Sequence, residues 1–340
     1  MALTINHQTN DISATSGSVT IDGAAVGGGG GGGGADLYAA NESSPTAQPS
    51  ATGANAVAIG DQAIASGDDS LAFGEHSDAT GARSFSFGFG ATATHTGALA
   101  LGTSRAFAVD AVAIGIDDNS TSYGASSNNT VAIGKEAKAT SGNATAIGNG
   151  SSATAGYSLA MAGGTTSSSF AFAVGQQCTA SAEKSIAMGN RATSNIIGKF
   201  AVATNRFASN GDNCSASYRL QASTTDATAT VMTTNQSSAS SNNQIVAASD
   251  TAISFLGTIT AIQNGAQAYA AWKVEGLLVN DGGTTTLVNS TTTVIQNASN
   301  WGMALSADNT NNALSITCTG EASHNIRWMS NIQTSEVTYA

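Results

Sequence analysis

A tetrapeptide of two mostly large residues around a small one, closed by glycine, recurs along the middle of the chain. It appears first as Val57-Ala58-Ile59-Gly60 and then as Leu71-Ala72-Phe73-Gly74, and the glycines at 60, 74, 88 and 102 are 14 residues apart. Further rows end at residues 115, 134, 148, 162, 175 and 189, of which 162 is alanine and the others are glycine, which makes ten rows. A repeat this short and regular predicts a stack of similar units, each in contact only with its neighbours.

Each row divides into two short alternating segments. The period of two places Val57 and Ile59 on one side of a strand and Ala58 on the other. Residues 61–67 alternate again and end on a second glycine, and glycine supplies the positive φ angles that tight corners need. We therefore predict a β-solenoid of two-stranded coils. With neighbouring strands about 4.8 Å apart, ten coils would form a rod section of roughly 50 Å.

The residues of one row indicate that a single coil is too thin to stand alone. Large residues such as Leu71 and Phe73 are expected to fill the interior, whereas the other face is nearly all Ala, Ser and Thr. Small residues let a second backbone approach closely, so we expect three solenoids to share one core. The long row between Gly115 and Gly134 predicts a protruding loop at Asp117–Asn129.

These rows resemble the head repeats of YadA-type trimeric autotransporter adhesins, whose 14-residue unit has the form Ser-x-Ala-Ile-Gly. The resemblance covers residues 54–194, about 40% of the chain. It implies a left-handed parallel β-roll, a homotrimer and an adhesive, surface-exposed rod. The remainder departs from that family: we find no signal peptide at Met1–His7, no heptad stalk and no lipid-facing strands before the C-terminus.

The regions on either side of the rows suggest an anchor and a knob. We expect residues 1–26 to be a docking segment of short strands and residues 27–53, which begin with eight glycines, to be a flexible linker. Residues 195–340 contain alternating segments between Gly and Asn clusters, which predicts an antiparallel β-sandwich. This order of parts resembles that of phage tail fibres. The candidate docking residues are Leu3, Ile5, Val19 and Ile21.

All three tryptophans fall in the predicted sandwich. Trp272 and Trp328 alternate with aliphatic residues and are expected in its core. Trp301 lies in a polar stretch and could be either an exposed ring that stacks on a glycan or an anchor for its loop. Loops carry much of the binding by such folds, and three of them supply our candidate receptor contacts. These are Asp281, Thr284, Asn300, Trp301, Asp308 and Asn311.

Composition excludes several other functions. The net charge is −11 and the 11 Lys and Arg residues form no patch, which argues against binding to nucleic acid or to an anionic membrane. No apolar run is long enough to span a bilayer. The four His and three Cys residues are scattered, without metal-ligand spacing, and no P-loop or nucleophile elbow occurs. We therefore predict no catalytic residues, no metal and no cofactor, and we expect the cysteines to be buried thiols.

The favoured interpretation is a homotrimeric virion fibre of the phage tail, made in the host cytoplasm. The N-terminus would bind a tail, baseplate or adaptor protein, and the knob would bind a host cell-surface glycan or protein with an avidity that three copies increase. The alternatives are a capsid-attached head fibre or decoration protein, a bacterial surface adhesin, and an enzymatic tip. The last would need paired carboxylates, and Glu275, Glu321 and Glu336 are too scattered in sequence to nominate a pair.

Overall fold

The structure is a computed structural model that describes residues 47–117, 122–265, 268–297 and 301–339, together with the backbone of four short strands nearer the N-terminus. Those strands belong to a separate unit, Met1–Tyr38. In it β1 (Leu3–Asn6) pairs antiparallel with β2 (Asp11–Ala14), and β3 (Thr20–Ile21) with β4 (Ala24–Ala25). Three of the candidate docking positions, 3, 5 and 21, lie on these strands, whereas position 19 lies outside the described residues.

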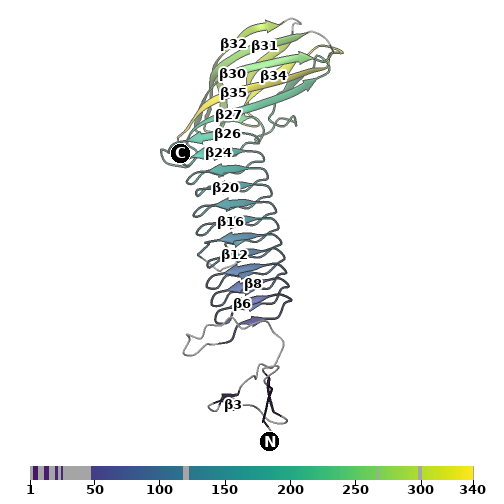
Figure 1. Ribbon diagram of the computed structural model, residues 1–340. Helices are drawn as coiled ribbons and strands as arrows, with labels where there is room; N and C mark the ends of the chain where they lie inside the picture. The colour runs from purple at the N-terminus through teal and green to yellow at the C-terminus, as the bar shows by residue number, and fades with distance from the viewer. Residues whose placement is uncertain are drawn as a thin grey trace. The chain divides into compact units, whose positions relative to one another are not determined.

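Residues 50–203 form a parallel β-solenoid of two stacked ladders (Figure 1), which confirms the prediction from the repeat. We name the ladders after the numbering of their strands. The even ladder contains β6 (Val57–Ile59), β8 (Leu71–Phe73), β10 (Phe85–Phe87), β12 (Leu99–Leu101), β14 (Val112–Ile114), β16 (Val131–Ile133), β18 (Thr145–Ile147), β20 (Leu159–Met161), β22 (Phe172–Val174), β24 (Ile186–Gly189) and β26 (Phe200–Ala203). The odd ladder contains β5 (Ser50–Ala51), β7 (Ile64–Ala65), β9 (Asp78–Ala79), β11 (Thr92–Ala93), β13 (Arg105–Ala106), β15 (Gly124–Ala125), β17 (Lys138–Ala139), β19 (Ser152–Ala153), β21 (Thr165–Thr166), β23 (Thr179–Ala180) and β25 (Thr193–Ser194).

The ladders differ from the predicted rows in two places. Phe200–Ala203, which we had grouped with the C-terminal region, pairs parallel with β24 and forms an eleventh rung. Within the long row, Gly124–Ala125 is a regular rung between β13 and β17, so the stretch from Asp117 to Asn129 is not one protruding loop as expected. Residues 118–121 of that row lie outside the described part of the chain.

The corners of the coils need glycine for two different reasons. Gly60 adopts a φ of 120°, in the region that other residues rarely enter. Gly67 has no such φ, but a Cβ there would lie 2.0 Å from the carbonyl oxygen of Gly81 in the next coil. At another corner of the coils the positive φ is taken by residues other than glycine, such as Asn55 and Asp69. Asn55 Nδ2 donates a hydrogen bond of 3.0 Å to Oδ1 of Asp69, one coil away.

The interior of the coils is filled by small residues, contrary to our expectation that Leu71 and Phe73 would fill it. Ala72, between them on β8, is fully buried, whereas Phe73 is 40% exposed on the outer surface. The alternation fixes which residues share a face and leaves open which face is inside. Alanine and serine dominate the space between the ladders, with Ile116 as a larger buried member. Some of the interior serines bond to nearby groups, as where Ser86 Oγ donates to the carbonyl of Ala91 at 2.8 Å.

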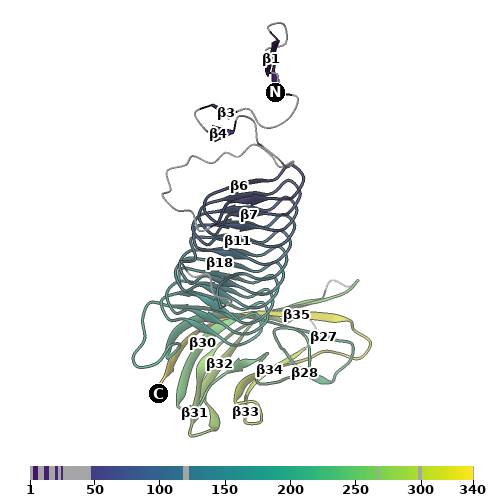
Figure 2. The same ribbon diagram turned by 90° about the horizontal axis from the view of Figure 1, so that it is seen from below.

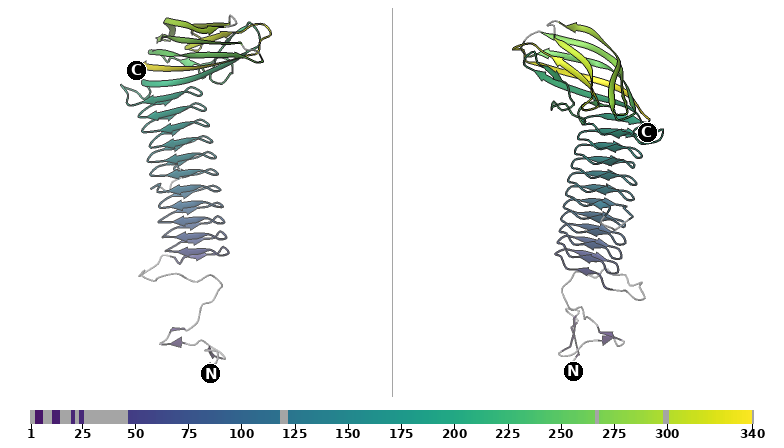
Figure 3. Two further views of the ribbon diagram at one scale, coloured as in Figure 1. Left: turned by 45° about the horizontal axis from the view of Figure 1, so that its top comes forward. Right: turned by 180° about the vertical axis from the view of Figure 1, so that it is seen from behind.

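The C-terminal strands continue the even ladder as an antiparallel sheet (Figures 2 and 3). A smaller sheet packs against the inner face of this extension, so the predicted antiparallel sandwich is confirmed. From β26 onward the extension runs, in spatial order, through β27 (Asn213–Thr224), β35 (Ile326–Thr338), β30 (Thr251–Gln263), β31 (Tyr269–Asp281) and β32 (Thr284–Asn297). The smaller sheet comprises β28 (Ala229–Val231), β29 (Ile245–Val246), β33 (Gly302–Asp308) and β34 (Ala313–Thr319).

Tryptophans form the centre of the sandwich core. The rings of Trp272 and Trp328 stack with centroids 5.6 Å apart, and Trp301 tilts against Trp328 at 5.7 Å. The indole N–H of Trp328 donates to Thr224 Oγ1 at 3.0 Å, so this buried polar group is satisfied. The expectation that Trp272 and Trp328 belong to the core is confirmed.

A buried ion pair joins the last coil to the sandwich. Lys199 Nζ lies 2.6 Å from Glu336 Oε2, and both side chains are less than a tenth exposed. The hydroxyls of Tyr218 and Thr334 each donate to Glu336 Oε1 at 2.8 Å. Desolvation raises the pKa of Tyr218 well above its usual value, and the neighbouring Glu336 adds to the shift. The phenol therefore stays protonated and serves as a donor to the carboxylate.

Candidate functional surfaces

Two of the three predicted contact loops lie together at one end of the sandwich. Asp281, the last residue of β31, and Thr284, the first residue of β32, are exposed and flank the turn between these strands. The backbone N–H of Thr285 donates to Asn309 Oδ1 at 2.7 Å, which ties this turn to the one that contains Asp308. Asn297, where the third predicted loop begins, lies at the opposite end of the 14-residue strand β32 from Thr284, so it is separated from the other two loops.

The turn after β33 is ordered by its own carboxylate. Asp308 accepts hydrogen bonds from the backbone N–H groups of Thr310 and Asn311 at 3.0 and 3.1 Å, and from Asn311 Nδ2 at 2.7 Å. Desolvation opposes ionisation, but the bonds from Asn311 and Thr310 outweigh it and lower the pKa of Asp308. Since Asp308 and the Asn311 amide already bond to each other, they hold the turn in shape and leave mainly its exposed neighbours free for contacts.

Trp301 is an anchor and not an exposed stacking ring. Its side chain is 3% exposed and packs against Trp328. The Asn297 side chain bonds to both the N–H and the carbonyl of Trp301, at 3.1 and 2.9 Å. Of our two interpretations, the loop anchor is therefore correct, and Trp301 leaves the set of receptor-contact candidates. Asn300 lies outside the described residues.

The outer face of the even ladder is an apolar stripe, which we name the even stripe. Its 11 strands each present two outward positions, and Thr145 alone among them is polar. Aromatic members are well exposed, for example Phe85 at 47% and Phe87 at 51%. The even stripe consists of Val57, Ile59, Leu71, Phe73, Phe85, Phe87, Leu99, Leu101, Val112, Ile114, Val131, Ile133, Thr145, Ile147, Leu159, Met161, Phe172, Val174, Ile186, Met188, Phe200 and Val202.

The odd ladder presents a different outer face. Its outward residues are mostly Ser, Thr and charged side chains, and only Ile64 among them is a large aliphatic residue. A continuous exposed apolar surface, as on the even ladder, is typical of an interaction surface. The polar surface of the odd ladder is instead typical of a face in contact with water. The sequence contains this contrast between the two segments of each row, but our prediction that the large residues fill the interior gave it the wrong meaning. The odd-ladder positions are Ser50, Ile64, Asp78, Thr92, Arg105, Gly124, Lys138, Ser152, Thr165, Thr179 and Thr193.

An exposed aromatic pair lies on a corner of the solenoid. Tyr157 and Phe170 are 61% and 52% exposed, and their rings stack 5.2 Å apart at an interplanar angle of 10°. Both residues have positive φ, 57° and 59°, which is unfavourable for bulky side chains. The equivalent corner positions of other coils carry polar residues such as Asn143 and Lys184. The pair is thus a second candidate contact surface, and its signal in the sequence is an aromatic residue at a corner position that is polar in other rows.

A groove with a mixed polar and apolar lining lies at the end of β27, β30 and β35. It has a cavity volume of about 670 Å³. Half of the residues that line it carry hydrogen-bonding groups, one of them a guanidinium, and the other half are apolar, among them the exposed Ile262 and Met329. Sequence analysis could not find this groove because its strands are far apart along the chain. The polar lining includes Gln221, Ser223, Gln236, Thr260 and Arg327.

The described residues show little that could carry chemistry. Among them, no group of three His, Cys, Asp or Glu side chains is placed to hold a metal ion. The three cysteines are buried and free, and burial raises the pKa of Cys318 to about 12, which keeps it a thiol. The part of the chain that the structure describes also contains no helix long and apolar enough to cross a membrane.

Comparison with known proteins assigns the solenoid. A search of the curated proteins gives no match to the sequence. A scan against protein-family models, however, matches the YadA head domain repeat. The matches fall on residues 51–77, 79–104, 125–151, 139–161 and 167–195, which coincide with the stacked coils. Residues 51–195 of this chain are therefore a run of YadA-type head repeats.

Proposed function

We propose that the chain is a homotrimeric virion fibre of a phage tail, which is assembled in the host cytoplasm and adheres to the host surface. The repeats and the solenoid fit a trimeric adhesin-like fibre. The observation that carries the proposal is the even stripe, an apolar surface that runs along the whole solenoid. The unit Met1–Tyr38 would dock to a tail, baseplate or adaptor protein, and the sandwich would contact a host glycan or protein.

The even stripe supports association of three copies. One coil buries mostly alanine inside, so it gains little of the roughly 25 cal/mol that each Å² of buried apolar surface contributes. The larger side chains remain partly exposed in a single copy. Packing three even ladders around a common axis would bury the stripe and leave the polar odd ladders in water. Because every rung carries the same pattern, the contact would extend along the full stack.

The sandwich offers surfaces that suit a glycan. The groove with Arg327 and the joined turns at 281–284 and 308–312 present exposed hydrogen-bonding side chains, both charged and uncharged. Weak contacts of this kind gain avidity when three copies bind one surface. The proposal assigns no catalytic step to the chain.

Oligomeric state is the first test. Ile133→Asp would place a carboxylate in the even stripe of every copy, and we expect the purified variant to sediment as a monomer whereas the parent sediments as a trimer. Thr179→Asp adds the same charge to the outer face of the odd ladder and is the matched control, which should remain trimeric. A parent protein that is monomeric at micromolar concentration contradicts the proposal.

Location and binding are the second test. Antibodies against the sandwich, viewed by electron microscopy, should label the tails of intact virions. Label on the capsid would instead favour a head fibre or decoration protein, and label on bacterial cells without phage would favour a surface adhesin, the alternative that the YadA repeats support. In a cell-adsorption assay, Arg327→Ala should weaken binding of the purified trimer, while Lys273→Ala, also exposed but outside the groove, should not.

A further inference from the structure

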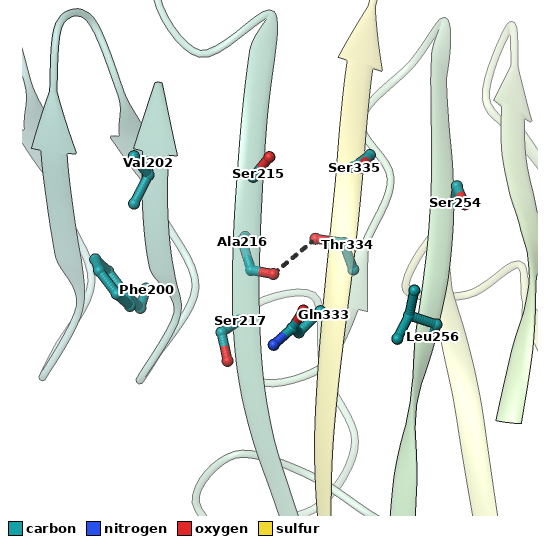
Figure 4. A pocket seen from close by; sticks show the side chains of 10 residues that line it. All are labelled: Phe200, Val202, Ser215, Ala216, Ser217, Ser254, Leu256, Gln333, Thr334 and Ser335. Carbon is teal, nitrogen blue, oxygen red and sulfur yellow. Dashed lines mark hydrogen bonds between the residues drawn. The ribbon is translucent and has the colours of Figure 1, made fainter. Parts of the chain in front are cut away.

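A hollow lies at the end of the even stripe, where the solenoid meets the sandwich (Figure 4). Phe200 and Val202 of β26 stand at one side and Leu256 of β30 at the other. The strands between them carry small or polar outward residues. On β27 these are Ser217, which pairs with Phe200, and Ser215, which pairs with Val202. The hollow has a cavity volume of about 270 Å³. If three copies pack along the stripe, this hollow leaves a void unless something fills it, and voids forfeit contacts.

The loop between β26 and β27 is held in a defined shape. Asp212 is 3% exposed, and its carboxylate accepts hydrogen bonds from the backbone N–H groups of Phe207, Ala208 and Ser209 at 3.0, 2.6 and 2.7 Å. The carbonyl of Asp212 also accepts a bond of 2.9 Å from the N–H of Thr338. This ordered loop presents the ring of Phe207 to solvent, 72% exposed.

A single exposed phenylalanine is ordinary on a protein surface. Here the ring and the hollow occur at the same level of the stack, because Phe207 follows Val202 by only five residues and the loop joins two strands that line the hollow. Rotation about an axis parallel to the stack keeps every residue at its own level. In a ring of three copies, the loop of one copy therefore lies at the height of the hollow of the next.

We propose that Phe207 of each copy inserts into the hollow of the neighbouring copy and interlocks three chains at the junction of solenoid and sandwich. This inference rests on the homotrimer proposed above. A cavity of about 150 Å³ is enough to hold a benzene ring, so the hollow has room for the phenyl group. Phe200, Val202 and Leu256 supply the apolar walls, and a contact from loop to hollow closes a ring of three without leaving a free end.

Disulfide trapping tests the contact. In the double variant Phe207→Cys/Ser217→Cys, mild oxidation with copper phenanthroline should link chains covalently, giving dimers and trimers on a non-reducing denaturing gel. The matched control is Phe207→Cys/Gln221→Cys, since Gln221 lies on the same face of β27 but roughly 13 Å further along it. Equal linking in both variants, or a bond formed only within one chain, overturns the inference.

Sedimentation before oxidation separates this inference from the homotrimer itself. A parent protein that is monomeric refutes both. A trimer in which residues 207 and 217 do not link refutes only the interlock. As an independent readout, Phe207→Ala should speed exchange of subunits between labelled trimers by about tenfold or more, because contact losses appear mainly in dissociation rates. Phe207→Leu should restore most of the parent's rate, and an unchanged rate in Phe207→Ala overturns the inference.

Discussion

The solenoid and the sandwich differ in where they place their large apolar side chains. Inside the coils, most fully buried residues are small, as at Ala132 and Ala146, and most large side chains lie on the outer face. In the sandwich the large side chains are inside, where Trp328 and Phe255 are at most 2% exposed. One continuous sheet carries both arrangements, so the orientation of the large side chains reverses near β26.

It follows from this reversal that the stability of the two regions depends differently on contacts with neighbouring copies. The sandwich buries its own aromatic side chains and can gain most of its stability within one chain. The solenoid keeps its larger side chains on the surface, so its remaining stability must come from contacts between copies. Variants in the sandwich should therefore act independently of protein concentration, and variants in the even stripe should act through assembly.

Removing the central tryptophan should have the largest effect. Trp328→Ala deletes a ring that contacts both Trp272 and Trp301 and should lower the free energy of unfolding of the sandwich by about 3–5 kcal/mol. The remaining tryptophans both lie in the sandwich, so urea titration followed by fluorescence reports on that region alone. Tyr269→Ala, at a position 54% exposed, is the control and should change stability by less than about 0.5 kcal/mol.

Circular dichroism recorded during the same titration tests whether the solenoid and the sandwich unfold separately. The solenoid holds most of the shorter strands and should retain its β signal at urea concentrations where the Trp328→Ala sandwich has lost its fluorescence. If both signals disappear together, the two regions unfold as one cooperative unit, and the distinction between self-sufficient and dependent cores does not apply to stability.

The buried ion pair at the junction comes next. Lys199→Met leaves Glu336 in a site less than a tenth exposed without its cation, and loss of one partner of such a pair costs about 3–5 kcal/mol. The hydroxyls of Tyr218 and Thr334 still donate to the carboxylate, so we expect the lower end of this range. The double variant Lys199→Met/Glu336→Gln removes the stranded charge and should recover part of the loss in urea unfolding. A single variant as stable as the parent contradicts this account.

The two faces of one strand allow a sharper test within the solenoid. Ala146→Leu forces a larger side chain between Ala132 and Ala160 of the adjacent rungs and should destabilise the solenoid by about 1–3 kcal/mol. Thr145→Leu adds an apolar side chain to the outward position beside it, and we expect it to leave the fold intact and strengthen the trimer. Thermal unfolding at two protein concentrations distinguishes the effects. Destabilisation by Thr145→Leu would show that the outer face does not pack against another copy.

The sequence alone predicts the stacked coils and the antiparallel sandwich, because both follow from a period of two with regular breaks. It predicts the wrong interior for the coils, because alternation at Leu71 and Phe73 is the same whether those residues point in or out. The deciding factor is the narrow space between the ladders, which depends on contacts between distant strands. Trp301 was ambiguous for the same reason, since its partner Trp328 is far along the chain.

The surfaces are harder to predict than the fold. The groove at Arg327 and the hollow beside Phe200 arise only when β27, β30 and β35 come together. By contrast, the sequence did place Asp281 and Thr284 on an exposed turn, because the adjacent glycines mark a corner. Local signals of this kind identify loops, and they leave open which loops meet.

The smallest effect concerns the loop that carries Phe207 and its dependence on pH. Desolvation opposes ionisation of Asp212, but three backbone N–H groups and the charge of Arg206 together hold its pKa below the usual value of 3.8. A lowered pKa in the folded state means that the carboxylate stabilises the loop above pH 3.8, and that this contribution is lost as the pH falls through the folded-state value.

Asp212→Asn should therefore speed hydrogen exchange at the amides of residues 207–209 near neutral pH, since the amide oxygen is a weaker acceptor than the carboxylate. In the parent protein the same amides should lose protection in acid, and the gap between parent and variant should close there. Other acidic groups titrate in both proteins, so the difference isolates Asp212. A gap that stays constant from neutral pH to well below 3.8 would mean that the charge of Asp212 does not order the loop, and that the shape presenting Phe207 comes from the β26–β27 hairpin alone.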